Sequence, residues 1–143
     1  MSSTDGLTLT LRGGAAALLA VVVNSVLVAA AQATGIAPDL RALSYPPVVF
    51  LTVVGVAGAT VVYWLLARRG GAVDRTFVRV AVVVLVLSFV PDVALLFADE
   101  TATVPGVLVL MVMHVVTAAA SIRLLTQRGL SAEDPTGPTA GEL

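Results

Sequence analysis

The sequence has no cysteine, no lysine and a single histidine, His114. Without cysteine the chain can form neither a disulfide nor a thiolate nucleophile, and one histidine cannot build a multi-histidine metal site. Charged residues make up only 12% of the 143 residues, about half of the fraction usual in soluble domains. The net charge is −1, so no basic excess exists to neutralise phosphates, which argues against a nucleic-acid partner.

Hydrophobic residues, 58% of the chain, are gathered into long runs without charge. Three runs, 13–38, 42–67 and 101–122, each exceed the roughly 20 apolar residues that a membrane-spanning helix needs. A fourth run reaches spanning length when it is read through Asp92. The sequence therefore predicts an all-α fold, a four-helix transmembrane domain over residues 13–127. Its helices are expected near 13–33, 47–67, 77–97 and 105–125.

Length separates these runs from strands, because soluble strands rarely exceed about 10 residues and an open sheet cannot cross lipid. Proline and glycine agree with the helical interpretation. Pro46-Pro47 and Pro105 lie where the second and fourth helices should begin, a position that tolerates a missing N–H. A glycine pair at 70–71 follows the second helix, as helix-stopping residues do.

Arginine placement predicts the orientation. Every arginine except Arg41 falls before the first helix, around the second connection or at the end of the fourth helix. Positive residues favour the cytoplasmic side, so we expect a multi-pass protein of the cell membrane with both termini in the cytoplasm. The third connection, which contains Asp99 and Glu100, is acidic and fits the outer side.

The segments outside the spans are short. We expect residues 1–12 to form a cytoplasmic tail and residues 128–143, rich in proline, glycine and acids, to form a disordered cytoplasmic tail. Residues 31–33, Ala-Gln-Ala, have the form of a signal-peptide cleavage site. The apolar stretch before them is longer than the usual signal-peptide core of about 7–15 residues, so we expect the first helix to be retained.

A few polar residues fall inside the predicted spans, where they are costly and usually face protein or water. Counted from the outer helix ends, Asn24, Ser88 and His114 lie at one depth of roughly 13 Å. Asp92 and Thr52 lie at a second depth of roughly 7 Å. This coincidence of depth predicts a polar seam along the inside of the bundle.

Small residues predict where the helices pack. Gly55, Gly58 and Ala59 on the second helix are expected to allow close approach of a neighbouring helix. Gly13 and Ala20 belong to a mostly small stripe on the first helix. The opposite faces are rich in valine and leucine and suit lipid.

Asp92 is the one charged residue well inside a predicted span. A carboxylate at the bilayer centre costs roughly 3 kcal/mol, and Pro91 beside it is expected to kink the helix. Two interpretations remain open. In the first, which we favour, Asp92 and His114 form a hydrogen bond that locks two helices together. In the second, they form a proton or ion site, with Ser88 and Asn24 as hydrogen-bonding partners.

Stronger motifs are absent from the sequence. It contains no phosphate-binding loop, no dinucleotide glycine pattern, no HExxH and no nucleophile elbow. We therefore expect neither enzymatic activity, nor a cofactor, nor a bound metal.

Two short motifs resemble a known family. They are residues 87–92, Leu-Ser-Phe-Val-Pro-Asp, and residues 113–116, Met-His-Val-Val. Through them the chain, from about residue 12 to 127, is similar to an uncharacterised domain-of-unknown-function family of small prokaryotic four-helix integral membrane proteins. The resemblance implies a four-helix membrane topology and no established activity.

Two functions follow as expectations. The small-residue faces and the lack of catalytic motifs favour a structural or accessory component of the membrane, surrounded by lipid and able to join a homo-oligomer or a membrane partner protein. The alternative is a small proton- or ion-coupled transporter that uses Asp92 and His114.

Overall fold

The computed structural model describes residues 3–126, which form four long helices and one short 3-10 turn. In chain order these are α1 (Ser3–Thr34), η1 (Arg41–Leu43), α2 (Tyr45–Arg69), α3 (Val73–Ala98) and α4 (Val104–Leu125). No strand occurs within the described residues, which confirms the all-α prediction. Each of the four helices is long and apolar enough to cross a membrane, as the charge-free runs predicted.

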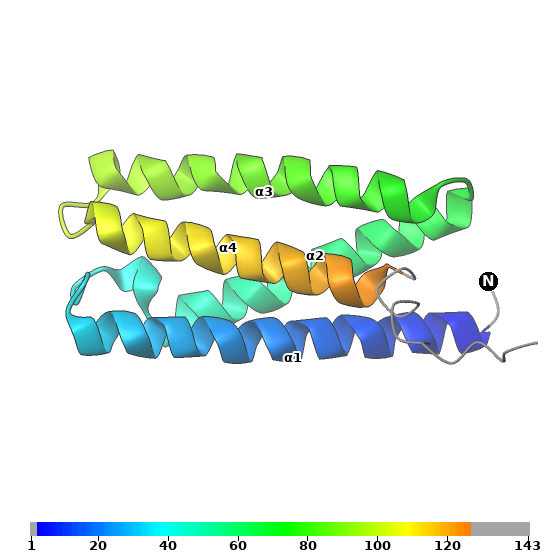
Figure 1. The fold of residues 1–143 in the computed structure, drawn as a ribbon, viewed down its shortest axis with the longest axis horizontal. Helices are drawn as coiled ribbons and strands as arrows, with labels where there is room; N and C mark the ends of the chain where they lie inside the picture. The colour runs from blue at the N-terminus through cyan, green and yellow to red at the C-terminus, as the bar shows by residue number, and fades with distance from the viewer. Residues whose placement is uncertain (1–2, 127–143) are drawn as a thin grey trace, which may run out of the picture.

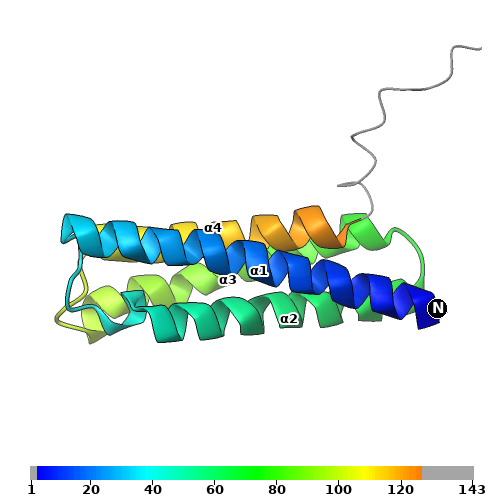
Figure 2. The ribbon, with the colours of Figure 1, turned by 90° about the horizontal axis from the view of Figure 1, so that it is seen from below.

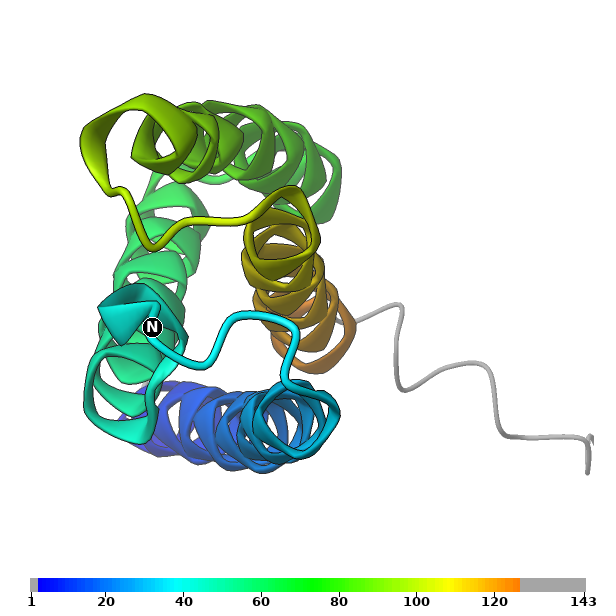
Figure 3. The ribbon, with the colours of Figure 1, turned by 90° about the vertical axis from the view of Figure 1, so that its left-hand side faces the viewer.

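The helices lie side by side, and helices that follow one another in the chain are antiparallel (Figure 1). α1 packs against both α2 and α4 and crosses them obliquely (Figure 2). Seen from one end, α1 and α3 stand on opposite sides of the bundle, with α2 and α4 between them (Figure 3). α4 therefore packs against each of the other three helices.

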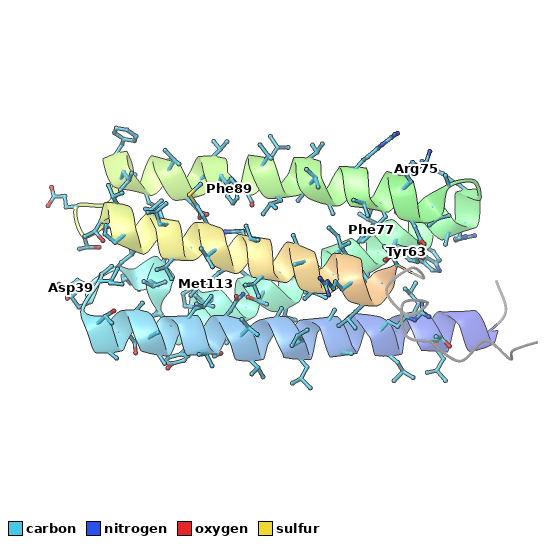
Figure 4. All side chains as sticks on the ribbon, viewed as in Figure 1. Asp39, Tyr63, Arg75, Phe77, Phe89 and Met113 are labelled. Atoms are coloured by element: carbon cyan, nitrogen blue, oxygen red, sulfur yellow. The ribbon has the colours of Figure 1, made fainter. Side chains whose placement is uncertain are left out.

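The bundle has two chemically distinct ends. The arginine-rich end holds the start of α1, the connection between α2 and α3, and the end of α4, and its described arginines are Arg12, Arg68, Arg69, Arg75, Arg79 and Arg123. The acidic end holds the other two connections, with Asp39, Asp99 and Glu100 beside Arg41. In Figure 4, Asp39 and Arg75 mark these opposite ends.

α1 begins earlier than the sequence predicted. The helix starts at Ser3, so the expected tail over residues 1–12 is wrong for residues 3–12, which are helical. Residues 1–2 and the tail expected at 128–143 lie outside the described residues. The prediction took the charge of Arg12 as the boundary, but a charge marks where lipid ends and not where a helix ends.

Packing at the arginine-rich end explains the extra helical turns of α1. Leu9 is buried in a cluster with Tyr63, Phe77 and Leu125, so each of the four helices contributes one side chain. Burial of Leu9 in this cluster stabilises the first turns of α1, which the local sequence alone does not indicate. Tyr63 and Phe77 meet edge to face, with ring centroids 5.2 Å apart (Figure 4).

The middle of the bundle is built from small side chains. Ala16 and Ala20 of α1 are fully buried against Val56 of α2 and Ala120 of α4. Toward the acidic end the buried side chains are larger, and Val28 packs with residues that include Met113. Without bulky residues in the middle layer, α1 can approach α2 and α4 closely.

α3 is the least buried helix. Its buried side chains are Phe77 near one end and Asp92 near the other. Large aliphatic side chains cover the rest of its surface and are exposed: Val82, Val83, Val84, Val86, Leu87, Val90 and Val93. This surface matches the apolar face that the sequence predicted for contact with lipid.

Glycines in the connections and at helix crossings have specific roles. Gly70 and Gly71 end α2 with φ angles of 75° and 87°, a left-handed region that favours glycine. Gly13 lies against α2, where an added Cβ would come within 2.6 Å of the Thr60 hydroxyl oxygen. This is a close helix contact that depends on the absence of a side chain.

Only two of the three small residues of α2 that were expected to pack against a neighbouring helix do so. A Cβ added at Gly55 would sit at ordinary contact distance, 3.6 Å, from Thr117 of α4. Ala59 packs against the cluster around Tyr63. Gly58 is different, because an added Cβ would meet nothing within 4 Å, so its predicted packing role within the chain is wrong. The turn of the helix places Gly58 away from the contacts that Gly55 and Ala59 make.

Replacement of Gly13 by alanine tests this close contact. We expect Gly13→Ala to lower the free energy of unfolding by about 1–3 kcal/mol, because both γ atoms of Thr60 would have to move. Unfolding in mixed detergent, followed by circular dichroism, measures the change. The matched control is Gly58→Ala, which adds a methyl group to open space and should leave stability equal or slightly higher. An equal loss of stability in both variants would show that Gly13 does not make the close contact with Thr60.

Candidate functional site

Asn24 joins three helices in the middle of the bundle. It lies on α1 and its side chain is only 1% exposed. Its Nδ2 donates to Thr52 Oγ1 of α2 at 3.0 Å and to Thr117 Oγ1 of α4 at 3.1 Å. Thr117 Oγ1 in turn donates to the carbonyl oxygen of Met113 at 2.9 Å. One amide group therefore ties α1 to both of the helices it packs against.

The other end of the Asn24 amide is left unbonded. Its Oδ1 is buried and accepts no hydrogen bond from any described residue. A buried acceptor without a donor costs free energy, so the two hydrogen bonds of Nδ2 are partly offset by the unpaired Oδ1.

Asp92 and His114 form the second polar contact, between α3 and α4. Asp92 is 6% exposed, and its Oδ2 lies 3.0 Å from Nδ1 of His114. The same Nδ1 lies 3.0 Å from the carbonyl oxygen of Leu110, one turn earlier in α4. Asp92 Oδ2 has no hydrogen bond of good geometry among the described residues. The imidazole is thus placed between two acceptors.

α3 continues through Pro91 as one helix. The proline does not break the helix, although it supplies no N–H to the carbonyl of Leu87. The kink expected at this position stays a prediction. Asp92 follows directly and points inward, whereas Pro91 itself is exposed.

Ser88 does not take part in either contact. Its hydroxyl donates to the carbonyl oxygen of Leu85 at 2.6 Å, within its own helix. The expectation that Ser88 and Asn24 would hydrogen-bond to the Asp92–His114 pair is therefore wrong. Serine in a helix readily bonds to a carbonyl three or four residues earlier, and this local bond uses its donor.

The predicted polar seam thus consists of two separate contacts. Thr52 was grouped with Asp92 by depth, yet it binds Asn24. Counting residues gives the height of a side chain in the membrane but not the direction in which it points. Thr117 lies three residues after His114, on the same side of α4, and this spacing is the sequence signal that points to its role.

A third polar contact lies at the arginine-rich end. The Tyr63 hydroxyl donates to Asp74 Oδ1 at 2.8 Å and links α2 to the first turn of α3. The guanidinium of Arg68 lies 4.7 Å from the centre of the Trp64 ring, close enough for a cation–π interaction. Sequence reasoning missed the Tyr63–Asp74 bond, because Asp74 looked like part of an exposed connection.

Metal binding has little support in the geometry. Within residues 3–126, no group of three or more histidine, aspartate and glutamate side chains is placed to hold a metal ion. The Asp92–His114 pair supplies two possible metal ligands, and no third such side chain lies beside it among the described residues.

Mutation of Asn24 tests the three-helix contact. We expect Asn24→Ala to lower the free energy of unfolding by about 1–3 kcal/mol, since two interhelical hydrogen bonds are lost. Thr52→Val keeps the shape but loses one bond, so its loss should be roughly half as large. Thermal unfolding in detergent measures both. Gln32→Ala, an exposed change on the same helix, is the control, and a loss as large as that of Asn24→Ala would contradict the assignment.

Comparison with known proteins agrees with this architecture. The chain matches DUF6069, a family of unknown function, over residues 5–131. No curated protein and no solved structure matches the chain. The matched region includes all four apolar helices and the motifs at residues 87–92 and 113–116, which confirms the resemblance that these motifs indicated. The chain therefore belongs to the DUF6069 family of unknown function.

Proposed function

We propose that this protein is a structural or accessory component of the membrane. The observation that carries the proposal is how the polar side chains of the spans are used. Asn24 binds Thr52 and Thr117, and Ser88 binds its own helix. These groups hold helices together or satisfy one another, as interhelical polar contacts do.

The outer surface supports a bilayer as the surrounding medium. Exposed valine and leucine side chains cover α3 and recur on the other helices, for example Leu18, Val26, Phe50 and Val112. Such a surface would be an aggregation hazard in water, whereas lipid covers it without cost.

Both termini are proposed to face the cytoplasm of the cell membrane. None of the arginines at the arginine-rich end forms an ion pair with a carboxylate in the described part of the chain. Arg69, Arg75, Arg79 and Arg123 are exposed, so their guanidinium groups can meet water and anionic headgroups on the cytoplasmic face.

Single cysteines test this orientation, because the natural chain has none. Glu100→Cys places a thiol at the acidic end, and Ala72→Cys places one at the arginine-rich end, both at exposed positions. In intact cells we expect a membrane-impermeant maleimide to label Glu100→Cys and to label Ala72→Cys only after lysis. The reverse pattern would overturn the orientation.

A proton- or ion-coupled transporter is the second candidate, and one observation favours it. Asp92 Oδ2 lacks a good hydrogen bond, and the side chain of His114 is 37% exposed. An ionisable pair that lies inside a span and is incompletely satisfied is an arrangement found in membrane ion pathways.

Flux and stability together separate the two candidates. For a structural role, Asp92→Asn should lower the free energy of unfolding by about 1–2 kcal/mol, while proton flux into proteoliposomes stays at background for wild type and variant. Ser88→Ala, which loses only a bond within its own helix, is the control. A flux that wild type shows and Asp92→Asn loses at unchanged stability would instead establish the transporter.

A further inference from the structure

Asp92 and His114 are an isolated ionisable pair. Along the described spans, α1 has no ionisable side chain between Arg12 and Asp39. α2 contributes Tyr45 at the acidic end and, at the arginine-rich end, Tyr63, which is bonded to Asp74, together with Arg68 and Arg69. On α3 and α4 the neighbouring charges are at the helix ends, namely Arg79, Asp99 and Arg123. Within residues 3–126, His114 is therefore the ionisable group that lies at ion-pair distance from Asp92.

An unbalanced charge at Asp92 is unfavourable. Its side chain is 9% exposed, and Oδ2 accepts no well-formed hydrogen bond from the described residues. If His114 were neutral with its proton on Nδ1, that proton would point to the Leu110 carbonyl and leave a bare carboxylate in an apolar surrounding. A hydrogen bond from Nδ1 to the Leu110 carbonyl adds little stability, because this carbonyl already accepts a backbone hydrogen bond within α4.

Two arrangements leave the pair without net charge. In the first, a protonated Asp92 donates from Oδ2 to the lone pair of Nδ1 on a neutral imidazole. In the second, the proton has crossed the 3.0 Å to Nδ1, which gives a carboxylate beside an imidazolium. The two contain the same atoms and differ only in the position of one proton. In both, Nε2 of His114 also carries a hydrogen.

We propose that Asp92 and His114 together form a proton-binding site that keeps one proton between Oδ2 and Nδ1 at neutral pH. Of the two side chains, that of His114 is the more exposed, 37% against 9% for Asp92, so the proton exchanges through His114. This site does not depend on whether the protein transports anything, so it extends beyond the accessory role proposed above.

The single histidine makes the test direct. Because His114 is the only histidine, labelling with 15N-histidine gives one imidazole without any assignment, provided that the affinity tag contains none. Full-length protein in lipid nanodiscs at pH 7.5 is measured by 15N NMR for the protonation of each ring nitrogen. Infrared spectroscopy of the same sample reports whether a protonated carboxyl is present.

The expected result is a protonated Nε2 together with one of two signs, an imidazolium or a protonated carboxyl band that Asp92→Asn removes. An Nε2 without a hydrogen would overturn the proposal. A neutral imidazole without the protonated carboxyl band would overturn it as well. If Asp92→Asn does not fold, a 13C label on the aspartate carboxyls reports whether one of them is protonated in the wild-type protein.

Asp99→Asn is the matched control. The Thr101 hydroxyl and amide donate to Asp99 Oδ1 and hold the pKa of this carboxyl below its ordinary value of 3.8. Asp99 is thus ionised at pH 7.5 and contributes no protonated band. Its replacement should leave both the band and the imidazole signals unchanged.

Discussion

Lipid is as apolar as the side chains of this chain, so burial of hydrophobic surface cannot by itself draw the four helices together. Close packing and polar contacts must do it instead. Ala16 and Ala20 are fully buried, and Gly13 leaves no room for a side chain beside Thr60, so α1 approaches its neighbours closely. The Asn24 amide then fixes the relative position of the helices, since its two bonds exist only where Thr52 and Thr117 are in register.

α4 is where these contacts are organised. Thr117 and His114 lie one helical turn apart, and they reach opposite neighbours, Asn24 on α1 and Asp92 on α3. α1 and α3 stand on opposite sides of the bundle, so α4 is the element that couples them (Figure 3). Asn24 Oδ1 has no hydrogen-bond partner among the described residues, and Asp92 Oδ2 meets only Nδ1 of His114, at 3.0 Å. The polar atoms of this bundle are thus few and only partly satisfied.

The spans were predictable from the sequence because charge is excluded from lipid, and the charge-free runs mark them. The contacts within the bundle were only partly predictable. Residue counting placed Asp92, His114 and Asn24 at useful depths, but it could not show that Ser88 bonds backward to Leu85. The start of α1 was missed for a related reason, since the residues that stabilise its first turns come from three other helices.

The structural role and the proton-binding role that we propose for Asp92 are compatible. α3 buries only Phe77 and Asp92, so the contact with His114 is a large part of what holds it to α4 beyond the arginine-rich end. A pair without net charge attracts across the interface, whereas loss of the shared proton would leave a carboxylate that lipid disfavours. Gain of a second proton would leave an imidazolium facing a neutral acid. Either change weakens the same contact, so the attachment of α3 follows the protonation of the pair.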